Sequence, residues 1–316
     1  MAFLFEPSDP STEAAFRRVA VEQLDKALAE AECGVSEAAK AIHGVRKRCK
    51  RLRGLLRLVR HSFPDYRREN AAVRDVAAGL SSLRDADVLS ATLDKVVGGF
   101  ADGLDPQAIE RLRETLGDRG HRAKAETDVP AALAEFRRAV GVIRERADDW
   151  TLNADGFDAM APGLAQVYRQ ARRDLKLIRR EPSAETFHDW RKQVKYHWHH
   201  LCLLRGCAPH VLTGQRDLAN DLAETLGDHH DTHVFLQVLD SEPSHFSGIE
   251  GLDAVRQAVE RRQDALGADA LRLGYELTAE RTACLVERLE SYWRNGRRLG
   301  AKEFGSGDRA QVSRAA

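Results

Sequence analysis

Two segments of the chain carry histidine, arginine and lysine in the same order and spacing. The residues are His43, Arg46, Lys47 and Lys50 and, 145 positions later, His188, Arg191, Lys192 and Lys195. Guanidinium and ammonium groups bind phosphate and carboxylate oxygens through charge-assisted hydrogen bonds. Imidazoles add donors that become stronger as the pH falls. The repeated pattern therefore predicts a site for a polyanion.

On an α-helix, these basic residues would form a strip beside an apolar stripe. Apolar positions from Ile42 to Val59 recur every three or four residues, which is typical of a helix that buries one face. The segment from Arg46 to Arg60 contains eight lysines and arginines and no acidic residue. Like charges at helical spacing destabilise a helix. The strip therefore needs counter-charges from other helices or an anionic ligand.

A basic run is more often a solvated helix face than a binding site. The duplication favours binding, because a solvated face could exchange arginine for glutamate, whereas both copies keep the same residue types. The second strip also follows another basic segment, which starts at Tyr168. We predict that the polyanion is bound by His43, Arg46, Lys47, Lys50, Arg53, Arg57, His188, Arg191, Lys192 and Lys195, with Arg17, Arg18, Arg169, Arg172 and Arg173 as further candidates.

The elements that position these residues are predicted to be helices throughout. Alanine, leucine, arginine and glutamate dominate the 316 residues, whereas isoleucine occurs five times and asparagine four times. Helix-breaking and capping residues predict helix starts near Asp9-Pro10, Ser36, Asp65, Asp105-Pro106 and Pro130. Residues 148–163 are rich in such residues and predict a linker between two halves, 8–150 and 157–300. Residues 301–316 are expected to form a flexible tail.

The composition excludes several classes of protein. Lysine plus arginine and aspartate plus glutamate each number 49, and the absence of net charge excludes a uniformly basic nucleic-acid coat. No run of apolar residues is long enough for a membrane span, and no signal peptide is recognisable at the N-terminus. We therefore expect a cytoplasmic protein without a membrane partner. The five scattered cysteines predict reduced thiols.

The duplicated His-x-x-Arg-x-x-x-Lys pattern in a helical chain resembles the CHAD family of histidine-containing α-helical domains. Two segments interpreted as turns, Leu83-Arg84-Asp85-Ala86-Asp87 and Leu226-Gly227-Asp228, support the resemblance, which covers nearly all of residues 8–300. It implies an all-α CHAD domain of two antiparallel four-helix bundles related by a pseudo-twofold axis. It also implies a basic channel that binds inorganic polyphosphate and an association with polyphosphate granules.

The sequence departs from the family pattern in the second copy. Arg51-Leu52-Arg53 in the first copy corresponds to Tyr196-His197-Trp198 in the second. The second strip is therefore expected to hold phosphate less tightly or to use its histidines. Polyphosphate has no bases, so a site of high charge density does not need stacking aromatic residues or base-reading groups. We expect a non-catalytic binding protein without a cofactor or a metal, and homo-oligomerisation stays open.

Two alternative functions also stay open. In the segment Asp228-His229-His230-Asp231-Thr232-His233, one helical turn separates His229 from His233, a spacing that can chelate a metal. His197, His199 and His200 form a further histidine cluster. A metal-dependent phosphohydrolase is therefore an alternative, and the competing interpretation is that these histidines only cap or flank a helix. A basic groove could also bind a nucleic-acid backbone without sequence specificity, since the chain has no recognised base-reading motif.

Overall fold

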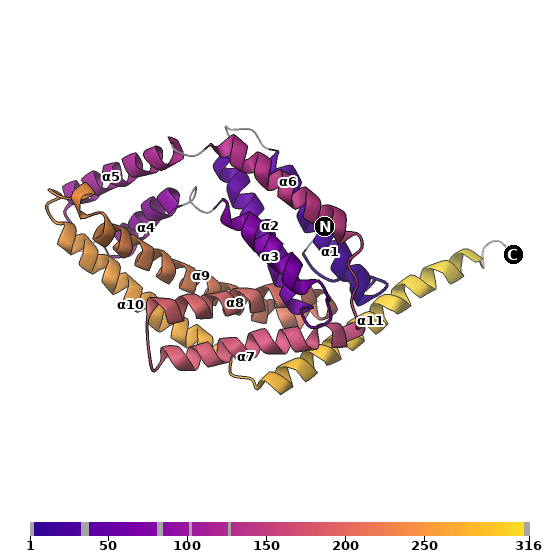
Figure 1. Cartoon of the computed structure of the whole chain (residues 1–316). Helices are drawn as coiled ribbons and strands as arrows, with labels where there is room; N and C mark the ends of the chain where they lie inside the picture. Colours follow the sequence, from indigo (N-terminus) through magenta and orange to yellow (C-terminus); the bar gives the residue numbers. More distant parts are fainter. Residues whose placement is uncertain (1–2, 33–37, 81–84, 101–102, 126–127, 313–316) are drawn as a thin grey trace.

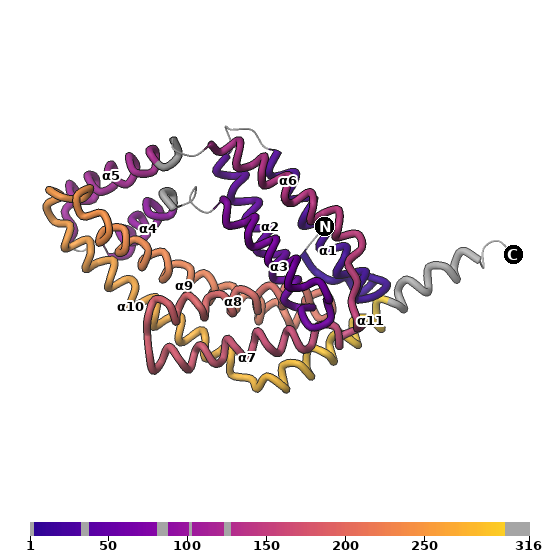
Figure 2. Tube along the Cα trace, viewed as in Figure 1, coloured from indigo at the N-terminus to yellow at the C-terminus, as the bar shows by residue number. Residues whose placement is uncertain are grey.

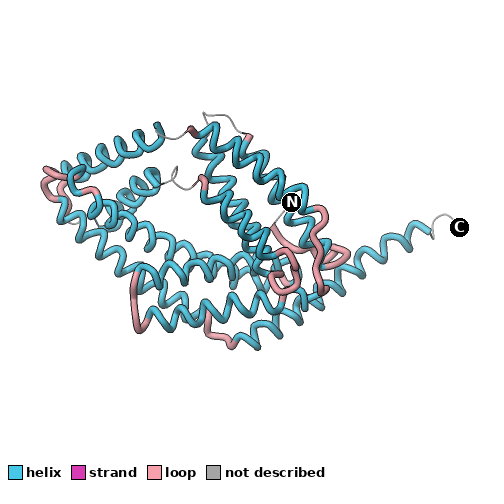
Figure 3. The backbone as a smooth tube through the Cα atoms, in the orientation of Figure 1, coloured by secondary structure: helices cyan, strands magenta, loops and turns pink. Residues whose placement is uncertain are grey.

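The computed structural model describes residues 3–32, 38–80, 85–100, 103–125 and 128–312. Within these residues every regular element is helical and no strand occurs (Figure 3), which confirms the predicted all-α class. The α-helices are α1 (Thr12–Ala31), α2 (Ala38–Leu58), α3 (Tyr66–Ala78), α4 (Asp85–Phe100), α5 (Pro106–Ala125), α6 (Val129–Ala147), α7 (Ala161–Ile178), α8 (Ala184–Leu204), α9 (Pro209–Ser241), α10 (Leu252–Leu277) and α11 (Thr282–Val312) (Figure 1). The described residues also contain the short 3-10 helices η3 (Gly156–Ala159), η4 (Arg205–Cys207) and η5 (Pro243–His245).

Four helix starts lie at or beside the breaking and capping residues that predict them. The Ser11 side chain caps α1, Asp65 precedes α3, and α5 begins at Pro106. The Asp128 carboxylate caps α6 by accepting a hydrogen bond from a backbone N–H of its first turn. Ser36, the predicted cap of the second helix, lies outside the described residues. Local capping chemistry is therefore a sufficient signal for these boundaries.

One of the two segments interpreted as turns is part of a helix. Leu226-Gly227-Asp228 lies inside α9, which continues from Pro209 to Ser241 without a break. A glycine inside a helix costs only about 1 kcal/mol relative to alanine, and Leu226 is buried against its neighbours here. The turn interpretation is therefore wrong for the second half. In the first half, residues 81–84 lie outside the described residues, and Asp85 begins α4.

Three apolar clusters of described residues hold the helices together. The largest surrounds Phe16 and Trp150 and packs α1, α2, α3 and α6 together. The second surrounds Trp190 and unites α7, α8, α9 and α10. The third surrounds Phe235 and joins α4 and α5 to α9 and α10 (Figure 2). Helices from the first half of the sequence thus pack on helices of the second half, and the pseudo-twofold pair of bundles stays a prediction.

The structure also describes the segments between and after the two predicted halves. Helix α6 ends at Ala147 and α7 begins at Ala161, so the predicted linker connects them and includes η3. Helix α11 extends to Val312, so residues 301–312 of the expected tail are helical. The sequence there includes alanine, lysine and glutamate, which have high helix propensity. No helix among the described residues is both long and apolar enough to span a membrane.

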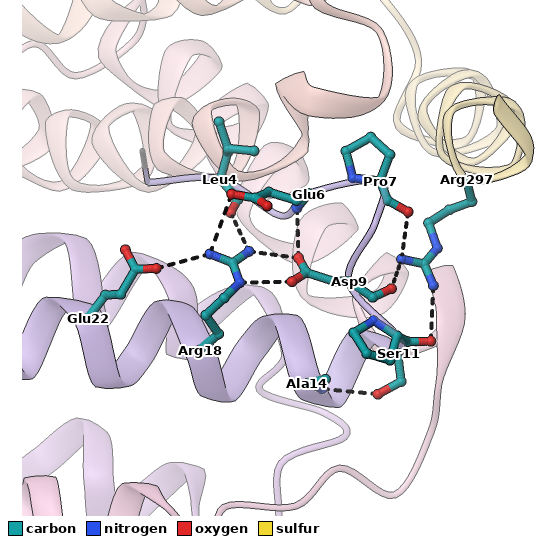
Figure 4. Close-up of polar contacts among 10 residues, drawn as sticks. Leu4, Glu6, Pro7, Asp9, Ser11, Ala14, Arg18, Glu22 and Arg297 are labelled. Carbon is teal, nitrogen blue, oxygen red and sulfur yellow. Dashed lines mark hydrogen bonds and ion pairs between the residues drawn. The ribbon is translucent and has the colours of Figure 1, made fainter. Parts of the chain in front are cut away.

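The N-terminal strap, residues 3–11, fastens α1 to α8 and α11. The backbone N–H of Phe5 donates a hydrogen bond of 2.8 Å to the Leu203 carbonyl at the end of α8. Arg297 of α11 donates to the carbonyls of Pro7, Asp9 and Pro10 (Figure 4). The strap therefore connects the N-terminus of the chain to α8 and α11.

Candidate anion-binding site

Helix α2 presents the first basic strip because its apolar residues face the core. The apolar positions that recur every three or four residues along α2 are buried, as the periodicity predicts. This rotation leaves His43, Lys47 and Lys50 exposed. Arg46 is half-buried, and its Nη1 donates a hydrogen bond of 3.3 Å to the carbonyl of Ala77 on α3. The first strip is thus a surface of α2 with one arginine held in place by α3.

Helix α8 presents the second strip in the same way. A capping box between Ser183 and Thr186 fixes its start, and Trp190 is fully buried on its core face. Lys192 is exposed and forms an ion pair of 2.6 Å with Asp189, one turn earlier on the same helix. An exposed pair of this kind contributes little to stability. Part of the second strip is therefore neutralised by its own helix.

A cavity of about 310 Å³ lies where α2, α8 and α9 meet, and we call it the cationic cavity. It is lined by His43, Arg46, Lys47, Lys50, Arg51, Lys195, Trp198, Asn220 and Glu224. Four residues predicted from the first copy thus surround one space with Lys195, which was predicted from the second. Glu224 is the one acidic residue among these lining residues. Such an excess of cations suits a ligand that carries several negative charges.

Burial and neighbouring positive charges lower the pKa values of two basic side chains that line the cationic cavity. The Lys195 Nζ lies 4.1 Å from the centre of the Trp198 ring, a cation–π contact. Burial lowers the pKa of Lys195, the charge of Arg191 lowers it further, and Glu224 opposes the shift. Burial likewise lowers the pKa of Arg51. A bound anion would stabilise the charged forms of both side chains.

His188 and Arg191, the first two residues of the second strip, do not line this cavity. The His188 ring lies 4.8 Å from the His230 ring of α9. The Arg191 guanidinium lies beside Gly227, where a Cβ would be 3.7 Å from its Nη2. Burial and then the charges of Lys192 and Arg191 lower the pKa of His188. Its imidazole therefore gains a proton only at a lower pH than a free imidazole would.

Arg53 and Arg57, the predicted residues on the last turns of α2, contact α3 and α8 outside the cationic cavity. Arg53 Nε donates a hydrogen bond of 3.3 Å to the Asn70 side chain of α3. The Arg57 guanidinium lies over the Tyr196 ring of α8, 4.1 Å from its centre. Neither residue lines the cationic cavity. The basic strip of α2 thus continues beyond the cavity, with its arginines held against α3 and α8.

The candidates on α7 lie at a different place. Arg169 and Arg173 line a separate cavity of about 350 Å³ with His61 and Gln166. The His61 ring forms a hydrogen bond of 2.8 Å with the Gln166 side chain. Arg172 is not among the lining residues of either cavity. The structure therefore does not gather the α7 arginines with the strip of α2.

The two candidates on α1 form ion pairs and hydrogen bonds with other residues of the protein. Arg17 forms a 2.8 Å ion pair with Glu13 and hydrogen bonds to the carbonyl of Trp150. Arg18 makes two hydrogen bonds of 2.8 and 2.7 Å to the Asp9 carboxylate and a third to Glu22 (Figure 4). Asp9 is the first cause of the raised pKa of Arg18. Both arginines lie outside the cationic cavity.

The side chains of residues 228–233, the segment of the metal alternative, contact different neighbours. His229 stacks on the Phe187 ring with the centroids 4.1 Å apart, and burial lowers its pKa to about 4. Asp228 forms ion pairs with Lys95 of α4 at 2.6 Å and Arg262 of α10 at 3.3 Å. Across the described part of the chain, no three His, Cys, Asp or Glu side chains are arranged to hold a metal ion.

A third cavity, of about 410 Å³, adjoins the cationic cavity, and we call it the arginine cavity. It is lined by Phe3, Arg51, Trp198, His199, Cys202, Arg205, Arg216, Asp217 and Asn220, so the two cavities share Arg51, Trp198 and Asn220. None of these lining residues is among those predicted to bind the polyanion, and His199 belongs only to the histidine cluster of the metal alternative. A partial signal exists, because Arg51 belongs to the basic run and Arg205 lies 145 positions after Arg60.

Comparisons with known proteins agree with the helical architecture. The sequence matches the family model of the CHAD domain over residues 18–240. The structure is similar to the crystal structure of the CHAD domain from the plant Ricinus communis, with a TM-score of 0.58 and 19% sequence identity. The likeness covers 89% of this chain and 96% of that chain. No curated protein matches the sequence. The chain belongs to the CHAD domain family.

Proposed function

We propose that the protein binds inorganic polyphosphate in the cationic cavity without turning it over. The observation that carries this proposal is the meeting of α2 and α8 around a single space. His43, Lys47 and Lys50 from one half of the sequence and Lys195 from the other line this cavity. Cations from two distant segments can then bind successive phosphates of one chain.

The chemistry of the lining residues matches a ligand made only of phosphate. Each charged hydrogen bond to a phosphate oxygen contributes about 1.5–3 kcal/mol. Trp198 is the one tryptophan of the lining, and Lys195 already occupies a position over its ring. This arrangement favours a ligand recognised by its charge over one recognised by stacked bases. Affinity should fall steeply with salt, as it does for nucleic-acid backbones.

Binding is favoured over hydrolysis by what the cavity lining contains. Hydrolysis of a phosphoanhydride needs a water molecule activated by a metal or by a general base. Glu224, the acidic lining residue, is exposed and accepts a hydrogen bond of 2.9 Å from Asn220. A solvated carboxylate in this setting is a poor general base. We therefore propose a polyphosphate-binding protein that associates with polyphosphate granules in the cytoplasm.

Charge reversal on α2 tests the proposal. Lys47→Glu with Lys50→Glu should weaken polyphosphate binding at least about 100-fold, because two attractive contacts become repulsive. Both side chains are exposed, so the helical content should not change. The dissociation constant is measured by calorimetry with polyphosphate of defined length across a salt series, and circular dichroism checks the fold.

The matched control reverses two exposed arginines of α5, Arg111→Glu with Arg122→Glu, which line neither cavity. This control makes the same change in net charge and should bind nearly as well as the wild type. Equal loss in both double variants, or no loss in either, would contradict the assignment. Equally tight binding of RNA would favour the nucleic-acid alternative, and release of orthophosphate with manganese would favour the phosphohydrolase.

A further inference from the structure

The arginine cavity brings together guanidinium groups from three elements. Arg51 comes from α2, Arg205 from η4 and Arg216 from α9. The charges of Arg205, Arg216 and Arg51 all act on the Cys202 thiol in the same wall, where burial nevertheless raises its pKa. The cavity is therefore a concentration of positive charge that the binding mode proposed above does not use.

Carboxylates neutralise these arginines only in part. Arg216 forms a 2.5 Å ion pair with Asp217, the acidic residue of the lining. Among the described residues, neither Arg51 nor Arg205 forms an ion pair. The Arg51 guanidinium lies over the Phe3 ring, 5.5 Å from its centre. The charge of Arg205 contributes to lowering the pKa of Arg51. The Arg51 and Arg205 guanidinium groups are thus close enough to repel each other, and the charge of Glu30 acts on Arg51 without forming an ion pair among the described residues.

His199 supplies an independent sign of a missing partner. Its side chain lines the arginine cavity and is only 3% exposed. Neither ring nitrogen has a hydrogen-bond partner among the residues that the structure describes. The ring packs between Phe3 and Trp198, with centroid distances of 5.8 and 4.7 Å. A buried polar group without a partner is costly, and a phosphate oxygen in the cavity would accept a hydrogen bond from the ring.

We propose that the arginine cavity is a second phosphate subsite and that one polyphosphate chain passes Trp198 to occupy both cavities. Arg51 lies in both walls and binds the chain where it passes from one cavity to the other. Arg205 and Arg216 bind the phosphates that follow, and a ring N–H of His199 donates to one of their oxygens. This inference rests on the proposed function and predicts a dependence of affinity on chain length.

Arg205→Ala tests the second subsite. Its affinity for long-chain polyphosphate should fall about tenfold, the effect of one lost charged contact. Its affinity for tripolyphosphate, which is short enough to remain in the cationic cavity, should stay within about twofold of the wild type. Both constants are measured by calorimetry at one fixed ionic strength. The matched control is Arg111→Ala on α5, which removes the same charge from an exposed position and should affect neither ligand.

A second variant tests the role of His199. His199→Gln keeps a side-chain donor and should retain more affinity for the long chain than His199→Phe, with tripolyphosphate affinity unchanged in both. If Arg205→Ala weakens both ligands equally, or neither, the second subsite is disproved while the proposed function stands. If the wild type binds neither ligand, both proposals fail.

Discussion

Acidification from pH 7 to pH 5 should destabilise the protein strongly, because α8 buries three neighbouring histidines. His197, His199 and His200 are 1%, 3% and 0% exposed. Burial is the largest cause of their lowered pKa values, which are about 4 for His197 and about 3 for His200, and well below the usual range for His199. The folded chain therefore keeps these rings neutral in mildly acidic solution.

The sign of the effect follows from proton uptake. Below pH about 6.5 an unfolded histidine binds a proton, whereas the buried rings do not until the pH reaches their lowered pKa values. The unfolded state thus binds more protons, and the free energy of unfolding decreases as the pH falls through this window. At pH 5 the loss is about 2 kcal/mol for each such histidine. Above pH about 6.5 these groups contribute no pH dependence.

Urea denaturation at the two pH values measures this loss. His200→Leu removes one of the three rings, so the difference between pH 7 and pH 5 should shrink by about 2 kcal/mol. The control His210→Leu removes an exposed ring at the start of α9 and should leave that difference unchanged. If His200→Leu shows the wild-type pH dependence, the buried histidines are not the origin of the acid sensitivity.

The same histidines connect stability with the proposed site. The charges of Lys195, Arg51 and Lys50 all contribute to keeping His199 neutral. Protonation of this ring would add a further positive charge beside both cavities. A bound polyanion reduces that repulsion, so polyphosphate should protect the protein against acid more than it stabilises it at neutral pH.

The sequence predicts the parts of this fold that depend on local chemistry. The α-helical class, the starts of α1, α3, α5 and α6 and the exposed positions of α2 follow from composition, from capping residues and from helical periodicity. Periodicity identifies the apolar face of a helix but not the helix that covers it. The packing of α4 and α5 on α9 and α10 was therefore not predictable, nor was the position of Gly227 inside α9.

In the candidate site, too, the sequence predicts what depends on local pattern and does not predict what depends on the packing of helices. The strip on α2 could be predicted because the duplication marks it twice in the sequence. Arg18 and Lys50 are both basic residues that the sequence places on a helix. The structure distinguishes them, because the Arg18 guanidinium forms ion pairs with Asp9 and Glu22. The repeat marks Arg205 only through its alignment with Arg60, and it does not mark either Arg205 or His199 as a cavity residue. Their role depends on the crossing of α2 over α8, which is a tertiary contact.

Gly54 permits that crossing, and its replacement should have a large effect on both stability and binding. A Cβ at Gly54 would lie 2.7 Å from the Cβ of His199 and 2.9 Å from its ring, closer than packed atoms tolerate. Gly54→Ala should therefore force α2 and α8 apart and lower the free energy of unfolding by about 3 kcal/mol, although alanine itself favours the helix by about 1 kcal/mol. Because α2 and α8 form the walls of both cavities, polyphosphate affinity should fall as well.

The matched control for this substitution is Gly214→Ala in α9, where nothing lies within 4 Å of the added Cβ. That variant should be more stable than the wild type by about 0.5–1 kcal/mol, because the alanine gains helix propensity without a clash. Urea denaturation at neutral pH gives both values, and calorimetry of the folded variants gives the affinities. A Gly54→Ala protein as stable as the wild type, with unchanged affinity, would show that the two basic strips do not depend on this close approach of α2 and α8.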